Sequence, residues 1–272
     1  MVQIPLWATI WTFSAAVVPL AALLCLPLRR YLCRYVTDND HVASWRRVAL
    51  ITAHPDDESM FFAPTIVSLI AAGLPVHILC LSTGDADGLG KVRSKEFELA
   101  CRALKVKEEH IAVIDDQRLP DGLSTIWPLT VVQEHVRTFI QAHQIDTVIT
   151  FDKSGVSGHN NHIAAHRAVE RLIQQNETLE QPGSTVEGGN RTPLRAWQLI
   201  TVPFVRKYLG TLDIIWSIMQ MNIFGGICFI SPNADMSLNA MRLHASQWVW
   251  YRRLFVRFAR YSYVNTLHEI VC

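Results

Sequence analysis

The chain has 272 residues, of which half are hydrophobic and 18% are charged. Its 25 Lys and Arg residues nearly balance its 24 Asp and Glu residues, which gives a formal net charge of +1. This balance argues against a strongly basic nucleic-acid-binding protein and against an acidic tail, and the hydrophobic content argues against intrinsic disorder.

An uncharged apolar run occupies residues 4–28. It is long enough to cross a bilayer, because about 20 helical residues span the hydrocarbon core. Arg29, Arg30 and Arg34 follow the run, and no Lys or Arg precedes it. The positive-inside rule then places the N-terminus in the lumen and the rest of the chain in the cytosol. A cleaved signal peptide would instead have a basic start and a shorter apolar core. We therefore predict a transmembrane anchor at 1–30, a linker at 31–47 and one folded domain at 48–272.

Strand and helix signals alternate after the linker. Short apolar runs predict strands at 48–53, 76–82, 111–115, 146–151, 197–202 and 226–230. Helices are predicted at 61–72, 93–104, 129–143 and 163–174, and a polar loop at 175–195. This alternation is typical of a Rossmann-like, doubly wound α/β fold with a mostly parallel sheet. In the strand order 3-2-1-4-5, the first and fourth strands are neighbours, and ligands bind beyond their carboxyl ends.

The C-terminal third differs in composition. Residues 209–230 are largely apolar but include Asp213, Gln220 and Asn222, which favours core plus a membrane-facing element over a second transmembrane helix. Residues 241–264 contain no acidic residue and combine five arginines with aromatic side chains. A basic, aromatic amphipathic helix of this kind suits an anionic membrane surface. A core helix with a solvated arginine face is an equal alternative.

Two segments offer metal ligands. The sequence AHPDDE follows the first predicted strand at 53–58, and GHNNH follows the fourth at 158–162. The predicted strand order brings both segments together. Histidine and aspartate are ligands of open catalytic zinc sites, which keep a coordination position for water. Each motif alone has a structural explanation, such as acidic residues at a helix N-terminus, but their joint placement favours a metal site.

These two motifs resemble those of the LmbE-like, or PIG-L, superfamily of zinc-dependent de-N-acetylases. The segments MFFAPT at 60–65, TFDKSGVSGHNNH at 150–162 and HASQWVWYRRL at 244–254 are similar to its eukaryotic members. The resemblance implies an LmbE-like catalytic domain anchored in the endoplasmic reticulum membrane. It also implies a glycolipid substrate, N-acetylglucosaminyl-phosphatidylinositol, whose deacetylation is the second step in making glycosylphosphatidylinositol anchors.

The resemblance further implies roles for five residues. His54, Asp57 and His162 match the family's metal ligands. Asp56 matches the general base, and His159 matches the histidine that stabilises the oxyanion, for which we expect a protonated ring. Either of these two could protonate the leaving amine. One Zn²⁺ is expected, although iron or manganese also occupy His/Asp sites.

Four further residues are candidate substrate contacts. Arg93 belongs to an R-x-x-E element with Glu96, for which a structural pair on a helix is the alternative. Asp121 resembles a sugar-binding position but is also typical of a turn before glycine. His244 and Gln247 match the family's H-x-[ST]-Q element and are expected on the pocket wall.

Glu58, the last residue of the first motif, is expected either to support a ligand imidazole or to begin the next helix.

Two other functions remain open: a deacetylase of another N-acetylated sugar, or a non-catalytic, membrane-tethered lipid-binding subunit. The anchor and the basic C-terminal segment count against the first. The free carboxylate of Asp56 beside the expected ligands counts against the second, because a scaffold has no need of a base.

Overall fold

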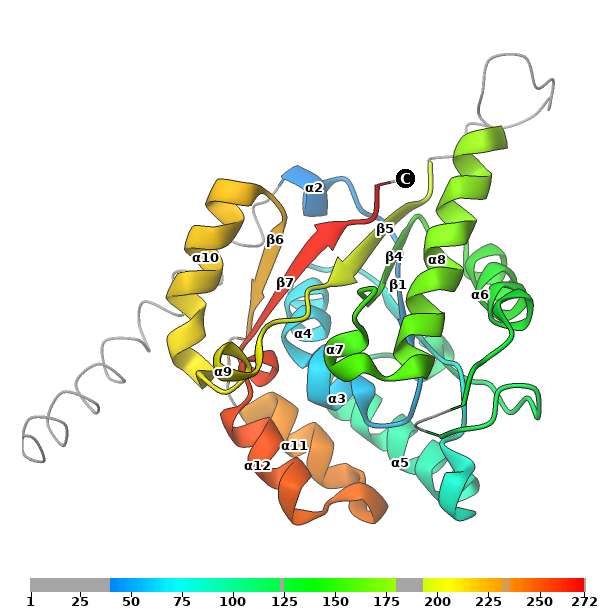
Figure 1. Ribbon diagram of the computed structural model, residues 1–272, viewed down its shortest axis with the longest axis horizontal. Helices are drawn as coiled ribbons and strands as arrows, with labels where there is room; N and C mark the ends of the chain where they lie inside the picture. The colour runs from blue at the N-terminus through cyan, green and yellow to red at the C-terminus, as the bar shows by residue number, and fades with distance from the viewer. Residues whose placement is uncertain (1–39, 123–124, 180–192, 232, 234, 272) are drawn as a thin grey trace, which may run out of the picture.

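The computed structural model describes residues 40–122, 125–179, 193–231, 233 and 235–271. The predicted anchor and the first part of the predicted linker lie outside these residues. In the ranges given, no helix has both the length and the apolar character needed to cross a membrane. The domain is built on a seven-stranded sheet of order β3-β2-β1-β4-β5-β7-β6, with helices on both faces (Figure 1).

Five parallel strands form the larger part of the sheet. In spatial order they are β3 (Ile111–Val113), β2 (Val76–Cys80), β1 (Val48–Thr52), β4 (Thr147–Phe151) and β5 (Arg195–Leu199). This order confirms the predicted 3-2-1-4-5 arrangement, with Val48 of β1 opposite Val76 on one side and Thr147 on the other. Strands β1, β2 and β4 are buried at every residue, as parallel strands covered on both faces should be. The segments after β1 and β4 therefore leave the sheet side by side.

Two antiparallel strands complete the sheet beyond β5. They are β7 (Val264–Glu269), which pairs with β5, and β6 (Ile227–Ile230), which pairs with β7. The sequence analysis predicted β6 but not β7. The chain forms the edge strand β6 first and then β7, which lies between β5 and β6, so chain order and spatial order differ here.

Helices cover each face of the parallel part. They are α3 (Asp57–Phe61), α4 (Ala63–Ala71), α5 (Gly90–Ala103), α6 (Leu129–His143), α7 (Gly155–Gly158) and α8 (Asn160–Leu179). One hydrophobic cluster joins α4 and α5 to the sheet, and a second joins α6 and α8 to its other face. Helix α8 is longer than predicted and occupies the beginning of the predicted loop at 175–195. Residues 180–192 of that loop lie outside the described ranges.

The C-terminal third forms α9 (Phe204–Lys207), α10 (Asp213–Phe224), α11 (Asp235–Leu243) and α12 (Trp250–Phe258). Short 3-10 turns lie at Asp85–Asp87, Glu108–His110, Gly210–Leu212, Ala245–Gln247 and Arg260–Ser262. The prediction of one basic helix across 241–264 is therefore wrong. Arg260 shows why: its guanidinium is fully buried and contacts Asp213 and Ser217, so it cannot belong to a solvated or membrane-facing stripe.

The end of the predicted linker belongs to the folded domain. It contains the short helix α2 (Asp40–Ala43). Val42 and Trp45 are each only 3% exposed, and the Trp45 ring lies 5.6 Å from that of Trp197 in β5. Packing of these two side chains against the sheet fixes where the chain enters the domain.

Candidate metal and catalytic site

The loops after β1 and β4 bring the three predicted metal ligands together. His54, Asp57 and His162 are buried, and their ligand atoms lie within 4.8 Å of one another. His162 Nε2 lies 3.2 Å from Asp57 Oδ1, and His54 Nδ1 lies 3.9 Å from Asp57 Oδ2. Side chains from the two segments therefore form one cluster at the carboxyl edge of the sheet.

The hydrogen bonds of His162 and Asp57 fit a bound cation. His162 Nδ1 donates to the carbonyl oxygen of Gly155 at 3.1 Å, which turns its Nε2 toward Asp57. This buried Nε2 has no hydrogen-bond partner among the described residues, and it faces a carboxylate oxygen. Asp57 Oδ2 is already held by the backbone N–H groups of Ala53 and His54, at 3.0 and 2.9 Å. An imidazole nitrogen and a carboxylate oxygen this close together in a buried site are suited to bind one metal ion.

The charge state of Asp57 agrees with this role. Burial alone would raise the pKa of Asp57, but the neighbouring His162 and His54 hold it well below its usual range. The ring of His162 is stacked on Phe151, with 3.9 Å between centroids, which fixes its orientation. Asp57 is thus ionised, as a metal ligand must be, and the His162 ring is held in place.

A second group of possible ligands shares His54. It consists of His54, Asp121 and His159, which are also close enough to hold an ion. Asp121 Oδ1 lies 3.0 Å from His54 Nε2, so Asp121 reaches the site as expected. Asn161, which the sequence analysis did not single out, is fully buried with its Nδ2 3.0 Å from the same nitrogen. The fully buried set of His54, Asp57 and His162 is the better metal site, because Asp121 and His159 are more exposed.

Asp56 has a different environment from its neighbour Asp57. Its backbone lies in the left-handed region at φ 117°, which is uncommon for a non-glycine residue and is found most often at functional sites. Its buried Oδ2 has no hydrogen-bond partner within the described ranges, but it lies 3.2 Å from Arg252 Nη2 and 3.7 Å from Arg93 Nη2. Burial raises the pKa of Asp56, and Arg252 opposes that effect. The result is a carboxylate held by charge and available to accept a proton.

Arg252 was missed because its arginine-rich segment was assigned to a solvated or membrane-facing surface. The signal that could have found it is its spacing from Val256, an apolar residue one turn later that is 1% exposed. Residues four apart share a helix face, so Arg252 points inward with Val256.

Arg93 holds several loops of the site in place. It donates to the carbonyl oxygens of Pro55 and Gly84, each at 2.8 Å, and its Nη1 lies 3.4 Å from Asp121 Oδ2. Gly84 is required here, because a Cβ at its φ of +70° would lie 2.5 Å from the guanidinium. The alternative of an Arg93–Glu96 pair is not what the structure shows, since Glu96 accepts from the N–H and hydroxyl of Ser246. Substrate contact by Arg93 or Asp121 stays a prediction.

Glu58 and His244 form a buried pair behind Asp56. His244 Nε2 lies 2.7 Å from Glu58 Oε1, and both side chains are fully buried. Glu58 Oε2 accepts from the backbone N–H of Asp56 at 3.1 Å. Glu58 therefore holds the backbone of Asp56 rather than a ligand imidazole. The His244 imidazole is fully buried against Glu58, and its expected contact with substrate stays a prediction.

Gln247, the other residue of that element, is 7% exposed with Nε2 3.3 Å from Ser246 Oγ. Its contact with substrate stays a prediction.

His159 differs from the expected protonated ring. Burial and the nearby His162 lower the pKa of His159 to about 4, so the ring is neutral near pH 7. Its Nδ1 accepts from the backbone N–H of Asn161 at 3.3 Å, which leaves the proton on Nε2. The ring centroid lies 4.7 Å from His54 and 4.8 Å from His162. His159 therefore offers one neutral N–H donor beside the ligand cluster.

Comparisons with known proteins agree with this site. The PIG-L family model, described as GlcNAc-PI de-N-acetylase, matches residues 49–173, which include all three candidate ligands. A probable N-acetylglucosaminyl-phosphatidylinositol de-N-acetylase of Dictyostelium discoideum is 35% identical over 241 residues, covering 83% of this chain and 93% of that protein. The N-acetylglucosaminyl-phosphatidylinositol de-N-acetylase of Bos taurus is 34% identical over 224 residues, covering 82% and 83%.

The fold is also found among solved structures. N,N'-diacetylchitobiose deacetylase from Pyrococcus horikoshii has a TM-score of 0.55 at 19% identity, covering 92% of this chain and 91% of that one. The extent of the sequence matches, over nearly the whole length of the Dictyostelium discoideum protein, shows that the chain belongs to the PIG-L family of de-N-acetylases.

Proposed function

We propose that the chain is a zinc-dependent amidohydrolase that converts N-acetylglucosaminyl-phosphatidylinositol and water to glucosaminyl-phosphatidylinositol and acetate. This would be the second step in making glycosylphosphatidylinositol anchors. The relatives that cover most of the chain carry this activity in their names. The observation that carries the proposal is the pairing of a buried His-Asp-His ligand set with a separate buried carboxylate, Asp56.

The proposed location is the endoplasmic reticulum membrane, with the catalytic domain in the cytosol and the N-terminus in the lumen. The apolar run at 4–28 and the arginines that follow it support this orientation.

His54, Asp57 and His162 would hold the ion. When bound, zinc supplies Lewis-acid activation of water and of the acetamide carbonyl. These three side chains are already arranged by the carbonyl of Gly155 and the backbone N–H groups of the loop after β1, so little reorganisation accompanies binding.

Asp56 acts as the general base. Its Oδ2 takes a proton from the water that attacks the acetamide carbon, while Arg252 and Arg93 fix the carboxylate. The C–N bond then breaks, and the acetyl group leaves as acetic acid, which keeps the second proton of the water and then ionises to acetate in solution. The sugar nitrogen needs one proton. Asp56 now holds that proton and returns it to the amine.

His159 stabilises the charge that develops on the carbonyl oxygen. Its neutral Nε2–H donates a hydrogen bond there, and loss of one such donor costs about 3–4 kcal/mol in the barrier. Giving up this proton would leave an imidazolate, so His159 is not the acid for the leaving amine. Asp56 is then the acid for that step.

Acetate release from N-acetylglucosaminyl-phosphatidylinositol tests the proposal. The detergent-purified full chain is assayed as purified, after chelation and after zinc is restored, beside Asp56→Asn and the surface control Asp115→Asn. We expect release that disappears with the chelator, returns with zinc, and is lost only in Asp56→Asn. Full turnover by Asp56→Asn would overturn the mechanism. Equal rates with free N-acetylglucosamine would favour a soluble-sugar deacetylase, and no release from a metal-loaded sample would favour a binding subunit.

A further inference from the structure

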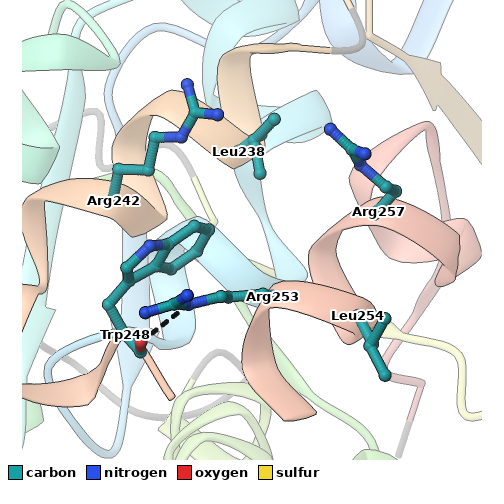
Figure 2. Close-up of a pocket in the computed structure, with 6 residues that line it drawn as sticks. All are labelled: Leu238, Arg242, Trp248, Arg253, Leu254 and Arg257. Carbon is teal, nitrogen blue, oxygen red and sulfur yellow. Dashed lines mark hydrogen bonds between the residues drawn. The ribbon is translucent and has the colours of Figure 1, made fainter. Parts of the chain in front are cut away.

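A pocket on the surface of the C-terminal third is separate from the metal site. It lies between α11 and α12 (Figure 2). Its volume is about 330 Å³. Its lining is Leu238, Arg242, Trp248, Arg253, Leu254 and Arg257. None of these residues belongs to the site described above, so the pocket needs an explanation of its own.

Three arginines line different sides of this pocket, and no carboxylate is among its lining residues (Figure 2). Arg253 donates to the carbonyl oxygen of Trp248 at 3.0 Å and lies over the Trp248 ring, 5.4 Å from its centroid. Arg242 has only a long contact of 3.4 Å, to the amide of Asn239. In the part of the chain that the structure describes, no Asp or Glu pairs with Arg242, Arg253 or Arg257. Such a group of like charges is complementary to an anion, and planar guanidinium groups match a phosphate well.

The exposed face of α12 is apolar. Trp250, Leu254 and Phe258 are spaced four residues apart and are 72%, 49% and 51% exposed. Arg253 and Arg257 follow one side of this apolar stripe, and Arg252 and Val256 point inward. An apolar stripe flanked by arginines is the pattern of a helix that lies in a membrane interface.

Exposed apolar side chains also lie on neighbouring helices. On α9, Phe204 is 74% exposed, and on α10, Trp216 and Phe224 are 58% and 71% exposed. The Tyr208 ring, just after α9, lies 6.3 Å from that of Phe255 in α12. Helices α9, α10 and α12 lie along one flank of the domain (Figure 1). An apolar surface of this extent marks an interaction site.

We infer that the pocket binds the phosphate group of an anionic bilayer phospholipid, while the stripe of Trp250, Leu254 and Phe258 enters the boundary of headgroups and acyl chains. Charge complementarity selects the phosphate, and the adjoining stripe selects a lipid over a free anion. The inference rests on the proposed function in one respect. The lipid site would serve to hold the domain against the membrane that carries the proposed substrate. Because Arg252 of the same helix contacts Asp56, this placement brings the site to the membrane surface.

Competition between lipids tests the inference. The full chain in a neutral detergent is equilibrated with equimolar phosphatidylglycerol and phosphatidylcholine, and the lipid that remains bound is measured by native mass spectrometry. Wild type is compared with R253Q/R257Q. The matched control is R167Q/R171Q, which removes two exposed arginines with the same spacing from α8. Metal content and thermal unfolding verify that each variant is folded.

We expect wild type and R167Q/R171Q to retain phosphatidylglycerol preferentially, and R253Q/R257Q to lose at least about fivefold of that preference. An unchanged preference in R253Q/R257Q, or an equal loss in the control, would overturn the inference. So would displacement of the lipid by an equal concentration of inorganic phosphate, which would indicate a soluble-anion site. A lipid-free dimer that R253Q/R257Q disrupts would instead indicate an interface between copies. The readout is lipid binding, so the inference and the proposed deacetylation can fail separately.

Discussion

The parallel half of the domain and its C-terminal third support two adjacent carboxylates in different ways. Asp57 is held by groups close to it in the fold of the parallel half: the backbone of Ala53 and His54, and the ring of His162. Asp56 is held by Arg252 of α12 and, through Glu58, by His244. The family model ends at residue 173. It therefore covers the candidate metal ligands but not Arg252 and His244, which hold Asp56 from the C-terminal third.

This difference has a physical reason. Two adjacent carboxylates in one buried site repel each other, so they need separate sources of positive charge. For Asp57, that charge comes from His162 and His54, and a bound metal ion would supply it in their place. For Asp56, it comes from Arg252 and Arg93. Substitutions on the two sides should therefore have separable effects on metal binding by Asp57 and on the support of Asp56.

The largest contrast should be between the two carboxylates themselves. Asp57→Asn removes a ligand, so we expect loss of bound metal together with all measurable acetate release. Asp56→Asn should keep its metal and lose about 10²- to 10⁴-fold in turnover, the usual contribution of general base catalysis. Metal analysis of both purified variants beside the rate assay checks this. Stoichiometric metal in Asp57→Asn would contradict the assignment.

The same contrast explains what the sequence could predict. His54, Asp57 and His162 follow strands whose neighbourhood comes from the regular alternation of the parallel half, so pattern and resemblance both indicate them. Strand β7 was missed because VNTLHE mixes apolar and polar residues without a clear period. It is defined mainly by pairing with β5 and β6, which no local pattern encodes.

The charges of the C-terminal third were misplaced for a related reason. Arg252, Arg253 and Arg260 look equivalent in sequence, but one contacts Asp56, one lines a surface pocket and one is fully buried with Asp213. Only the packing of α12 and its neighbours distinguishes them. Likewise, the neutral state of His159 depends on burial and on the ring of His162, neither of which is visible in the motif.

Breaking the buried support of Asp56 should have the next largest effect. His244→Ala leaves Glu58 buried without its partner, which costs about 3–5 kcal/mol of unfolding free energy. Urea unfolding of the full chain in neutral detergent measures this loss. His135→Ala is the matched control, because His135 contacts Asp116 at the same 2.8 Å but near the surface. We expect a much smaller loss there, because solvent screens this pair. Equal losses in the two variants would show that Glu58–His244 is not a buried structural pair.

Removing the charge beside Asp56 should have a smaller effect, confined to turnover. Arg252 forms an ion pair with Asp56, so we expect Arg252→Gln to lower kcat roughly 10- to 100-fold. Metal content should not change, because Arg252 contacts none of the three ligands in the structure. Arg102→Gln removes an arginine paired with Glu108 at the surface and should keep the wild-type rate. If Arg252→Gln lost metal in proportion to activity, Arg252 would belong to the support of the metal site.

The smallest effect should come from the opposite end of the sheet, where histidines gather without forming a site. His77, near the beginning of β2, stacks on His110 with 3.8 Å between centroids, and His143 lies 4.8 Å away. This trio is not among the possible metal-binding groups of the described residues.

Burial, with a contribution from His110, lowers the pKa of His77 to about 4. In the unfolded chain His77 has a pKa near 6.5, so it takes up a proton at a higher pH there than in the folded chain. The free energy of unfolding therefore decreases as the pH falls from 6.5 to 4. After a discount for solvent screening, we expect about 1 kcal/mol less stability at pH 5 than at pH 7 from this group. His77→Leu should remove that part of the pH dependence, as measured by urea unfolding at both pH values. Identical pH dependence in wild type and His77→Leu would show that the ring titrates alike in the folded and unfolded chains. Loss of this pH dependence in His77→Leu would show that the buried histidines at this end of the sheet affect stability alone. At the carboxyl end, buried histidines lie beside Asp56 and Asp57, and that combination is what the proposed reaction requires.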